Sequence, residues 1–505
     1  MSVEKQFLIE SLLQFNYLPT QKKFREELPP AFSTIKLTPN IAFQLTELPN
    51  RSGDFCGYDQ CEYKLTRFDN VSRNLSIPHP LAHCKLAFTI YDIWDKLEYI
   101  TKNSNSIIKP QTHADGRLII MNYEKSLPKS IRMLNQSFGN KFRAHADISS
   151  CFPSIYSHAL SWALIGFENS KKSKGNKFKN AWFNKLDESL RLTKRNETQG
   201  VAIGPATSNI VSEIILARVD EKLRMNFKFV RFIDDYTCDC YSESEAQNFI
   251  RQLTQELAKY KLNLNAKKTK IKRLPSSQAE EWVLDLATKI TGKEITSYDA
   301  IQYLDYAVAL ASKHPEGSVL KFAFKTLVNK KLDFMAKFDV LRYGLTLSFH
   351  SPVLLPYLDQ FLEDTWILSH KESSEKLNLI IKENSVLQRS DGMCWGIYLL
   401  CKLKASIDEN VAINVLETGD ALSILMLYWT GQFDEKVLHF YNALDKTDLY
   451  ALDNYWLLIY QLFYDEMIVN PYPDKVFSVL KTNNVSFFEP PTFNPNILNA
   501  FDIAF

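Results

Sequence analysis

The chain has 505 residues, of which 45% are hydrophobic, so it can bury large cores and is not globally disordered. Its 60 basic and 58 acidic residues give a net charge of +2, which excludes a surface that is basic throughout and binds nucleic acid everywhere. The sequence contains no run of 18 apolar residues and no signal-peptide pattern. We therefore expect a cytoplasmic protein of two or three domains without a membrane span.

The first 150 residues combine helix and strand signals. Residues 1–50 are predicted to form a helix followed by a proline-rich connection, and residues 83–102 are predicted to be helical. Residues 63–77 alternate like a β-hairpin with a polar turn near Asn70. Single strands are predicted at residues 117–123 and 141–148.

The next segment is predicted to be a loop followed by a long helix. The loop, residues 170–180, either is solvated or contacts nucleic acid. Its lysines are Lys171, Lys172, Lys174, Lys177 and Lys179. After Gly204 and Pro205 the apolar residues recur at helical spacing, so a helix is expected to begin there.

A second hairpin is predicted around Asp234 and Asp235. Two short apolar or aromatic runs, residues 227–233 and 236–241, flank these carboxylates. This pattern places both of them at the hairpin tip.

Helical patterns dominate the rest of the chain. Ser242 and Glu245 have the spacing of a capping box that opens a helix, and residues 262–265 are predicted to begin a last strand. Beyond residue 280 the strand signals fade. Two faintly similar segments suggest stacked, HEAT-like helical hairpins: Asp391…Trp395…Tyr398 and Asp453…Trp456…Tyr460. We expect an α+β region over residues 1–280 and an all-α domain over residues 281–505.

Three segments could together supply a site for phosphoryl transfer. Asp147 follows a predicted strand, residues 199–209 open a predicted helix, and Asp234 and Asp235 lie at the hairpin tip. The reaction needs an activated hydroxyl and a neutralised leaving group, and two divalent ions supply both. Magnesium prefers oxygen ligands, so Asp147 and Asp234 on adjacent strands would suit it.

Each segment alone has an ordinary structural explanation. An Asp-Asp pair is common turn chemistry, and a Gln-Gly pair is common in loops. Crowded carboxylates repel one another, however, and are costly unless cations arrive. The three segments in this order, each on a suitable element, therefore favour catalysis.

These segments resemble motifs A, B and C of reverse transcriptases, with Phe-Ile-Asp-Asp as a variant of motif C, and residues 262–271 resemble motif D. The resemblance covers roughly residues 60–275 and implies reverse-transcriptase-like fingers and palm. It implies that Asp147, Asp234 and Asp235 are catalytic and hold Mg²⁺ or Mn²⁺.

The resemblance also implies a nucleotide-binding set. Phe152 stands where the family places its sugar gate, which would select deoxynucleoside triphosphates, although its ring could also be a core aromatic. Gln199 and Gly200 would border the incoming nucleotide, because glycine permits close backbone approach. Lys268 would lie near the triphosphate, or else be a solvated lysine.

The hairpin at residues 63–77 would form the fingers. Arg67 and Arg73 are candidates for gripping the triphosphate, because guanidinium forks match phosphate oxygens. Either of them could instead be an ordinary surface arginine.

Segments near the N-terminus and the helical second half resemble bacterial abortive-infection polymerases, most closely the prophage-encoded members of enteric bacteria. The N-terminal segments are residues 17–19, 27–32 and 77–80. This resemblance implies template-independent DNA synthesis that is primed by a tyrosine of the protein, a single-stranded DNA product attached to that tyrosine, homo-oligomerisation and defence against phage. It does not identify the tyrosine.

Two alternatives remain. A template-copying, RNA-directed DNA polymerase with an RNA partner would be favoured by a thumb and a basic extension, and neither is evident in the sequence. A catalytically silent helical scaffold would be favoured by an incomplete carboxylate set, and here the set is complete.

Overall fold

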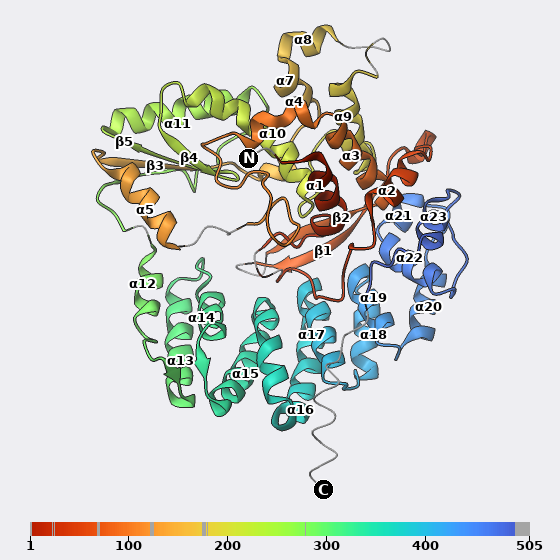
Figure 1. Cartoon of the computed structure of the whole chain (residues 1–505). Coiled ribbons are helices and arrows are strands. Elements are labelled where there is room, and N and C mark those ends of the chain that lie inside the picture. Colours follow the sequence, from red (N-terminus) through yellow and green to blue (C-terminus); the bar gives the residue numbers. More distant parts are fainter. Residues whose placement is uncertain are drawn as a thin grey trace.

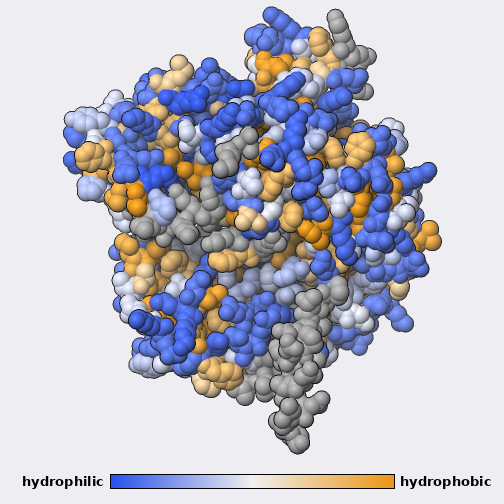
Figure 2. Space-filling view, in the orientation of Figure 1, coloured by the Kyte–Doolittle hydropathy of each residue, from blue (hydrophilic) through white to orange (hydrophobic). Residues whose placement is uncertain are grey.

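Figure 1 shows the computed structural model, which describes residues 3–489 except 23, 25, 68–70, 122–125, 174–177, 179 and 278. Within these residues no helix is both long and apolar enough to cross a membrane. On the face drawn in Figure 2, hydrophilic side chains predominate and hydrophobic ones are scattered among them. Most of the large apolar side chains instead form one continuous core, which runs from Val3 to Phe488.

A four-stranded antiparallel sheet forms the palm. Its strands are β3 (Phe142–Asp147), β4 (Phe229–Phe232), β5 (Asp235–Cys240) and β6 (Lys270–Arg273), in the order β4-β5-β3-β6. Helix α11 (Glu243–Ala258) packs against β3 and β5, and the alternate residues Ala144, Ala146, Tyr236 and Cys238 are buried. The intervening residues, which include Asp147 and Asp235, therefore lie on the opposite face of the sheet.

The helix α10 (Ala206–Leu223) is buried on nearly all sides beside the palm sheet. It contacts α3 (Pro80–Asp92), α4 (Trp94–Thr101), α7 (His158–Ile165) and α11. The other helices described in this half are α1 (Lys5–Glu10), a π-helical turn (Ser11–Phe15), α2 (Pro39–Thr46), a 3-10 turn (Gly53–Phe55), α5 (Ser126–Ser137), α6 (Cys151–Ser154), α8 (Phe167–Lys172) and α9 (Trp182–Leu192).

The second half is a layer of helices that lie side by side in an arc beneath the fingers and palm (Figure 1). They are α12 (Glu281–Ala287), α13 (Ser297–Lys313), α14 (Val319–Val328), α15 (Phe334–Ser348), α16 (Leu355–Val386), α17 (Ser390–Lys402), α18 (Glu409–Glu417), α19 (Ala421–Trp429), α20 (Asp434–Ala443), α21 (Leu449–Asp453), α22 (Trp456–Tyr464) and α23 (Val476–Thr482). Two short parallel strands, β7 (Glu294–Ile295) and β8 (Lys331–Leu332), join the first helices of the layer.

The helical layer is hydrogen-bonded to the fingers hairpin, which consists of β1 (Gln60–Thr66) and β2 (Ser72–Pro78). On the edge of β1 that does not pair with β2, Lys64 N–H donates to Ser390 Oγ at 2.8 Å and Thr66 N–H donates to Asp391 Oδ2 at 2.9 Å. Near its start, Asp59 N–H donates to Asp453 Oδ2 at 3.0 Å. The second half therefore covers what would otherwise be an open sheet edge.

The structure confirms the predicted fold class, an α+β fingers and palm followed by helices. Both predicted hairpins are present, as are the strand near residues 141–148 and the helix after Pro205. Residues 83–102 are helical as α3 and α4. Ser242 caps α11 by accepting a hydrogen bond from Glu245 N–H, although the Glu245 carboxylate accepts from Tyr241 N–H and not from Ser242.

Two predictions of local structure were wrong, and a third, the loop at residues 170–180, was wrong, within the described residues, only at its first three. Residues 117–121 form no strand, because the Asn16 side-chain oxygen takes the N–H groups of Leu118 and Ile119 that a strand ladder would use. Residues 262–265 contribute only one bridge, from Leu264 to Ile148, and the strand begins at Lys270. In the lysine-rich segment, Lys171 and Lys172 end helix α8. The other three lysines lie outside the described residues.

Candidate polymerase active site

The β-hairpin β4–β5 and strand β3 bring the three acidic residues together. Asp147 ends β3 directly opposite Asp235, the first residue of β5, in the antiparallel register. Asp234 lies in the tight turn between Phe232 and Asp235, and its carbonyl accepts a hydrogen bond from Ile148 N–H at 3.1 Å. Two segments that are distant in the sequence are thereby held together at the end of the palm sheet.

The turn itself is strained at Ile233. This β-branched residue has a φ of +58°, in the left-handed region that such side chains rarely adopt. Such a conformation costs on the order of 1–3 kcal/mol and persists only where neighbouring groups hold it in place. The strain lies immediately before the first of the two motif C carboxylates.

The carboxylates are electrostatically crowded. Burial, followed by the charges of Asp234 and Asp147, raises the pKa of the Asp235 carboxyl to about 7. Burial also raises the pKa of Asp234, and Asp147 adds to this shift. The Lys268 ammonium lies 3.0 Å from Asp147 Oδ2 and offsets part of the negative charge. Burial lowers the pKa of His145, which favours the neutral form of the imidazole that lies 3.7 Å from Asp235.

The donor set suits a hard divalent cation. Among the described residues, no three His, Cys, Asp or Glu side chains converge as a preformed metal cluster. Asp147, Asp234 and Asp235 nevertheless offer only carboxylate oxygens, which Mg²⁺ and Mn²⁺ prefer and which can be completed by water and phosphate oxygens. The pKa values of Asp234 and Asp235 are raised first by burial and then by the charges of neighbouring carboxylates, and a bound cation would relieve that repulsion. These residues therefore fit a divalent cation.

The fingers hairpin brings one of its two predicted arginines, Arg73, within electrostatic range of Asp234. Burial first and then the charge of Arg67 lower the pKa of Arg73, and the charge of Asp234 opposes this shift. The Arg73 guanidinium thus lies within electrostatic reach of both residues. Arg67 follows the end of β1, is exposed, and donates its N–H to the Val71 carbonyl at 3.2 Å.

The motif B segment packs against the short helix α6 that follows Asp147. Gly200 has a φ of +83°, and a Cβ there would lie 3.2 Å from the Pro153 carbonyl oxygen. Gly200 N–H donates to the Ile155 carbonyl at 2.8 Å, and the exposed Gln199 side chain lies over the same helix. The close backbone approach expected of this glycine is therefore made to α6.

Phe152 lies within α6 and is only 5% exposed. Its carbonyl accepts a hydrogen bond from Val201 N–H at 3.1 Å, which fixes α6 to the motif B segment. The ring is thus a core aromatic near Asp147, and any contact with a sugar would be made by its small exposed edge.

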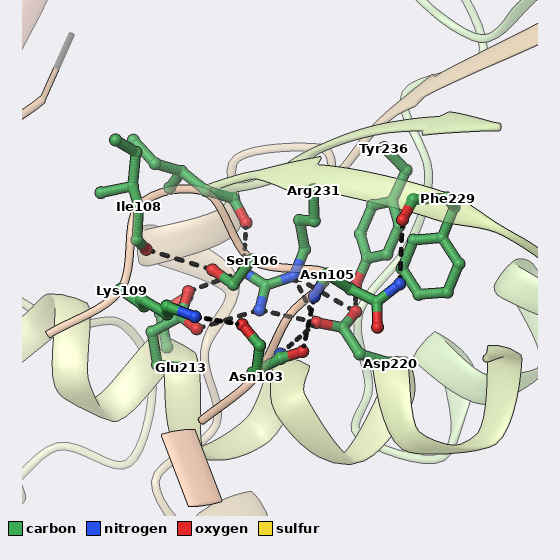
Figure 3. A network of polar contacts seen from close by, with 12 residues as sticks. Asn103, Asn105, Ser106, Ile108, Lys109, Glu213, Asp220, Phe229, Arg231 and Tyr236 are labelled. Atoms are coloured by element: carbon green, nitrogen blue, oxygen red, sulfur yellow. Dashed lines mark hydrogen bonds and ion pairs between the residues drawn. The ribbon is translucent and has the colours of Figure 1, made fainter. Parts of the chain in front are cut away.

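A buried ionic network beneath the turn was missed by the sequence reasoning (Figure 3). Arg231 on β4 is completely buried and binds both Glu213 and Asp220 of α10. Tyr236 Oη also donates to Asp220, at 3.0 Å. A signal was available, because Glu213 and Asp220 flank the apolar run of residues 214–217 and lie seven residues apart, which places them on one face of the helix.

Comparison with known proteins agrees with this geometry. Residues 94–308 match the model of the family described as reverse transcriptase (RNA-dependent DNA polymerase). No curated protein matches the chain.

Solved structures of Candida tropicalis telomerase are similar at low identity. Apo telomerase truncated from its C-terminal domain has 13% identity and a TM-score of 0.32, over 48% of this chain and 55% of that one. The apo enzyme has 12% identity and a TM-score of 0.32 over 78% and 70% of the two chains. The complex with a fragment of telomeric RNA has 11% identity and a TM-score of 0.33 over 80% and 67%. The chain thus spans about half the length of the first of these.

The family match covers β3, the motif B segment, α10, the β4–β5 hairpin and β6, which form the palm side of the site, but it does not include the fingers hairpin with Arg67 and Arg73. Residues 94–308, which include the three carboxylates, therefore match a reverse-transcriptase domain.

Proposed function

We propose that this protein is a DNA polymerase of reverse-transcriptase type that works without a template, primes on one of its own tyrosines and acts in abortive-infection defence against phage. The observation that carries the polymerase assignment is the pairing of Asp147 with Asp235, beside Asp234, at the end of the palm sheet. In this proposal Asp147 and Asp234 hold Mg²⁺ or Mn²⁺, and Asp235 lies alongside.

Bound divalent cations would activate the attacking hydroxyl and neutralise charge on the leaving pyrophosphate. The chain's own residues then position the nucleotide. Arg73, with Arg67 behind it, grips the triphosphate, and the exposed ammonium of Lys268 moves from Asp147 to a phosphate oxygen. Gln199 and Gly200 border the nucleotide, and the exposed edge of Phe152 disfavours a 2′-hydroxyl.

The priming step uses a phenolic oxygen in place of a primer 3′-hydroxyl. This oxygen bonds to the α-phosphorus of a deoxynucleoside triphosphate, and the bond from that phosphorus to the bridging oxygen breaks. Pyrophosphate leaves and the phenolic proton passes to solvent. Further additions to the new 3′-hydroxyl give single-stranded DNA attached to the protein.

Two features support synthesis without a template. The sequence resembles the abortive-infection polymerases, which share this property and assemble as homo-oligomers. In addition, the chain passes from β6 directly into a helical layer that is hydrogen-bonded to the free edge of the fingers strand β1. The fingers are therefore held from the side by the protein's own second half.

The test uses purified protein, Mg²⁺ and one labelled deoxynucleotide, with no nucleic acid added. We expect label to remain with the protein on a denaturing gel and to be released by protease as DNA on a short peptide. Asp234→Ala should abolish labelling, and a labelled ribonucleotide should be used poorly unless Phe152 is replaced by alanine.

Other outcomes would support the alternatives. Label that is incorporated only after primer and template are added would establish a template-copying enzyme with an RNA partner. No incorporation under any condition would favour the catalytically silent helical scaffold, and incorporation that survives Asp234→Ala would exclude the proposed active site.

A further inference from the structure

The guanidinium of Arg231 uses all five of its N–H donors inside the protein (Figure 3). Nε donates to Asp220 Oδ2 at 2.9 Å, and Nη2 donates to Asp220 Oδ2 at 2.8 Å and to Glu213 Oε2 at 3.0 Å. Nη1 donates to Glu213 Oε1 at 2.6 Å. Four donors thus form two carboxylate forks, and the remaining Nη1 donor binds the backbone carbonyl of Ile233 at 2.8 Å.

The Ile233 carbonyl belongs to the peptide group that joins Ile233 to Asp234. The strained φ of Ile233 needs a neighbouring group to hold it, and Arg231 supplies the bond from within the protein. On the other side of Asp234, its own carbonyl is held by Ile148 N–H. The backbone on both sides of Asp234 is therefore fixed, once by a side chain and once by β3.

The forks leave the guanidinium no freedom to rotate. Glu213 and Asp220 lie two turns apart on α10, the helix that begins directly after the motif B segment. The β4 backbone at Arg231 is held as well, because its N–H donates to the Asn105 carbonyl at 2.7 Å and its carbonyl accepts from Ile107 N–H at 2.9 Å. Asn103 also binds Asp220, at 2.7 Å. The position of the turn is thus tied to α10 and to residues 103–107.

We propose that Arg231 is a positioning residue, which sets the place of the Asp234 carboxylate for cation binding and nucleotidyl transfer through its bond to the Ile233 carbonyl. The proposal rests on the proposed role of Asp234. A lysine at this position would keep the buried positive charge, but its three donors cannot form two forks and also reach the turn.

The decisive variant is Arg231→Lys, and Arg143→Lys is its matched control. Arg143 lies on β3 in the same sheet and forms one fork with Asp239, with bonds of 2.6 and 2.7 Å, but it does not bind the turn. Both variants should lower the unfolding temperature. Only Arg231→Lys should weaken binding of Mn²⁺ alone, measured by calorimetry without nucleotide, and we expect a loss of about tenfold.

Kinetics give a second readout. In Arg231→Lys, kcat at saturating nucleotide should fall by about 10–100-fold and the Mg²⁺ concentration for half-maximal rate should rise, while the nucleotide KM changes little. In Glu213→Gln the side chain keeps its shape but binds Arg231 more weakly. This variant should give a smaller fall in kcat and a smaller rise in the Mg²⁺ concentration for half-maximal rate. It also serves as the test variant if Arg231→Lys does not fold.

Equal Mn²⁺ affinity in Arg231→Lys and Arg143→Lys, together with equal losses of thermal stability, would overturn the proposal and leave Arg231 with a structural role only. The Mn²⁺ titration does not require nucleotide transfer. A wild-type protein that incorporates no nucleotide would therefore contradict the proposed function, while this titration still decides the role of Arg231.

Discussion

At the residue scale, the burial of Asp235 and the neighbouring charges of Asp234 and Asp147 determine how the site responds to pH. Its pKa of about 7 means that the folded chain holds this proton more tightly than the unfolded chain does. The stabilisation linked to this group is fully present below about pH 4 and is lost as the pH rises through 7. A divalent cation competes with the same proton, so it should stabilise the fold most where the carboxylates are ionised.

We therefore predict that Mg²⁺ raises the unfolding temperature more at pH 8 than at pH 6, as measured by differential scanning fluorimetry. In Asp235→Asn, which cannot ionise at this position, the difference between the two pH values should shrink. An Mg²⁺ effect that is equal at both pH values in the wild type would contradict the electrostatic coupling of these carboxylates.

A second prediction concerns Gly200. Its positive φ makes any side chain there strained, and a Cβ would also meet the Pro153 carbonyl oxygen at 3.2 Å. Gly139 is the matched control, because it has a φ of +82° and no atom lies within 4 Å of its Cβ position. We expect Gly139→Ala to cost about 1–2 kcal/mol in unfolding free energy from backbone strain alone.

Gly200→Ala should cost about 1 kcal/mol more than the control, since overpacking of the α6 backbone adds to the strain. It should also reduce nucleotide incorporation, because α6 begins at Cys151, four residues after Asp147. Chemical denaturation measures the first effect and the labelling assay the second. If the two variants have equal unfolding free energies, the close contact at Gly200 adds nothing to the cost of the substitution.

At the scale of elements, local sequence patterns predicted individual strands and helices but not the contacts that join them. Alternation and turn chemistry were enough to place both hairpins and the carboxylates at the tip of the second. They could not reveal that the Asn16 side-chain oxygen takes the N–H groups of residues 118 and 119, because these residues lie 102 and 103 positions away in the sequence. The two similar segments that begin at Asp391 and Asp453 make a similar contact in the structure. Both aspartates accept hydrogen bonds from backbone N–H groups at β1.

The contact of Asp391 with β1 gives a third prediction. The Asp391 carboxylate is buried and accepts from both the N–H and the hydroxyl of Thr66, at 2.9 and 2.8 Å. Asp391→Ala leaves these donors buried without an acceptor, which should cost about 2–3 kcal/mol in unfolding free energy. Replacing the exposed Asp285 of α12 by alanine should change it by less than about 0.5 kcal/mol. Similar results for the two variants would mean that the contact with β1 does not stabilise the protein.

At the scale of the whole molecule, the two halves share one core. Arg51 forms an ion pair with Asp453 at 2.7 Å, Trp456 donates to the Ile77 carbonyl at 3.0 Å, and Phe32 packs edge-on against Phe488. The buried Glu26 lies 3.1 Å from Lys325, and the positive charges of Lys321, Lys22 and Lys325 lower its pKa to about 2 in spite of its burial. The division at residue 280 is therefore a change of secondary structure within one packed unit.

The last prediction follows from this shared core. A chain that ends at residue 280 would expose the outer edge of β1 together with the apolar surface that packs on the helical layer. It would also leave Glu26 and Arg51 without their partners, and removing one partner of a buried ion pair costs about 3–5 kcal/mol. Since a domain has only about 5–15 kcal/mol of stability, the shortened chain should aggregate or unfold when expressed alone.

Co-expression with residues 281–505 should restore a soluble complex, and calorimetry of the full chain should show one unfolding transition. A soluble 1–280 fragment that unfolds cooperatively at the temperature of the full chain would show instead that the fingers and palm fold independently.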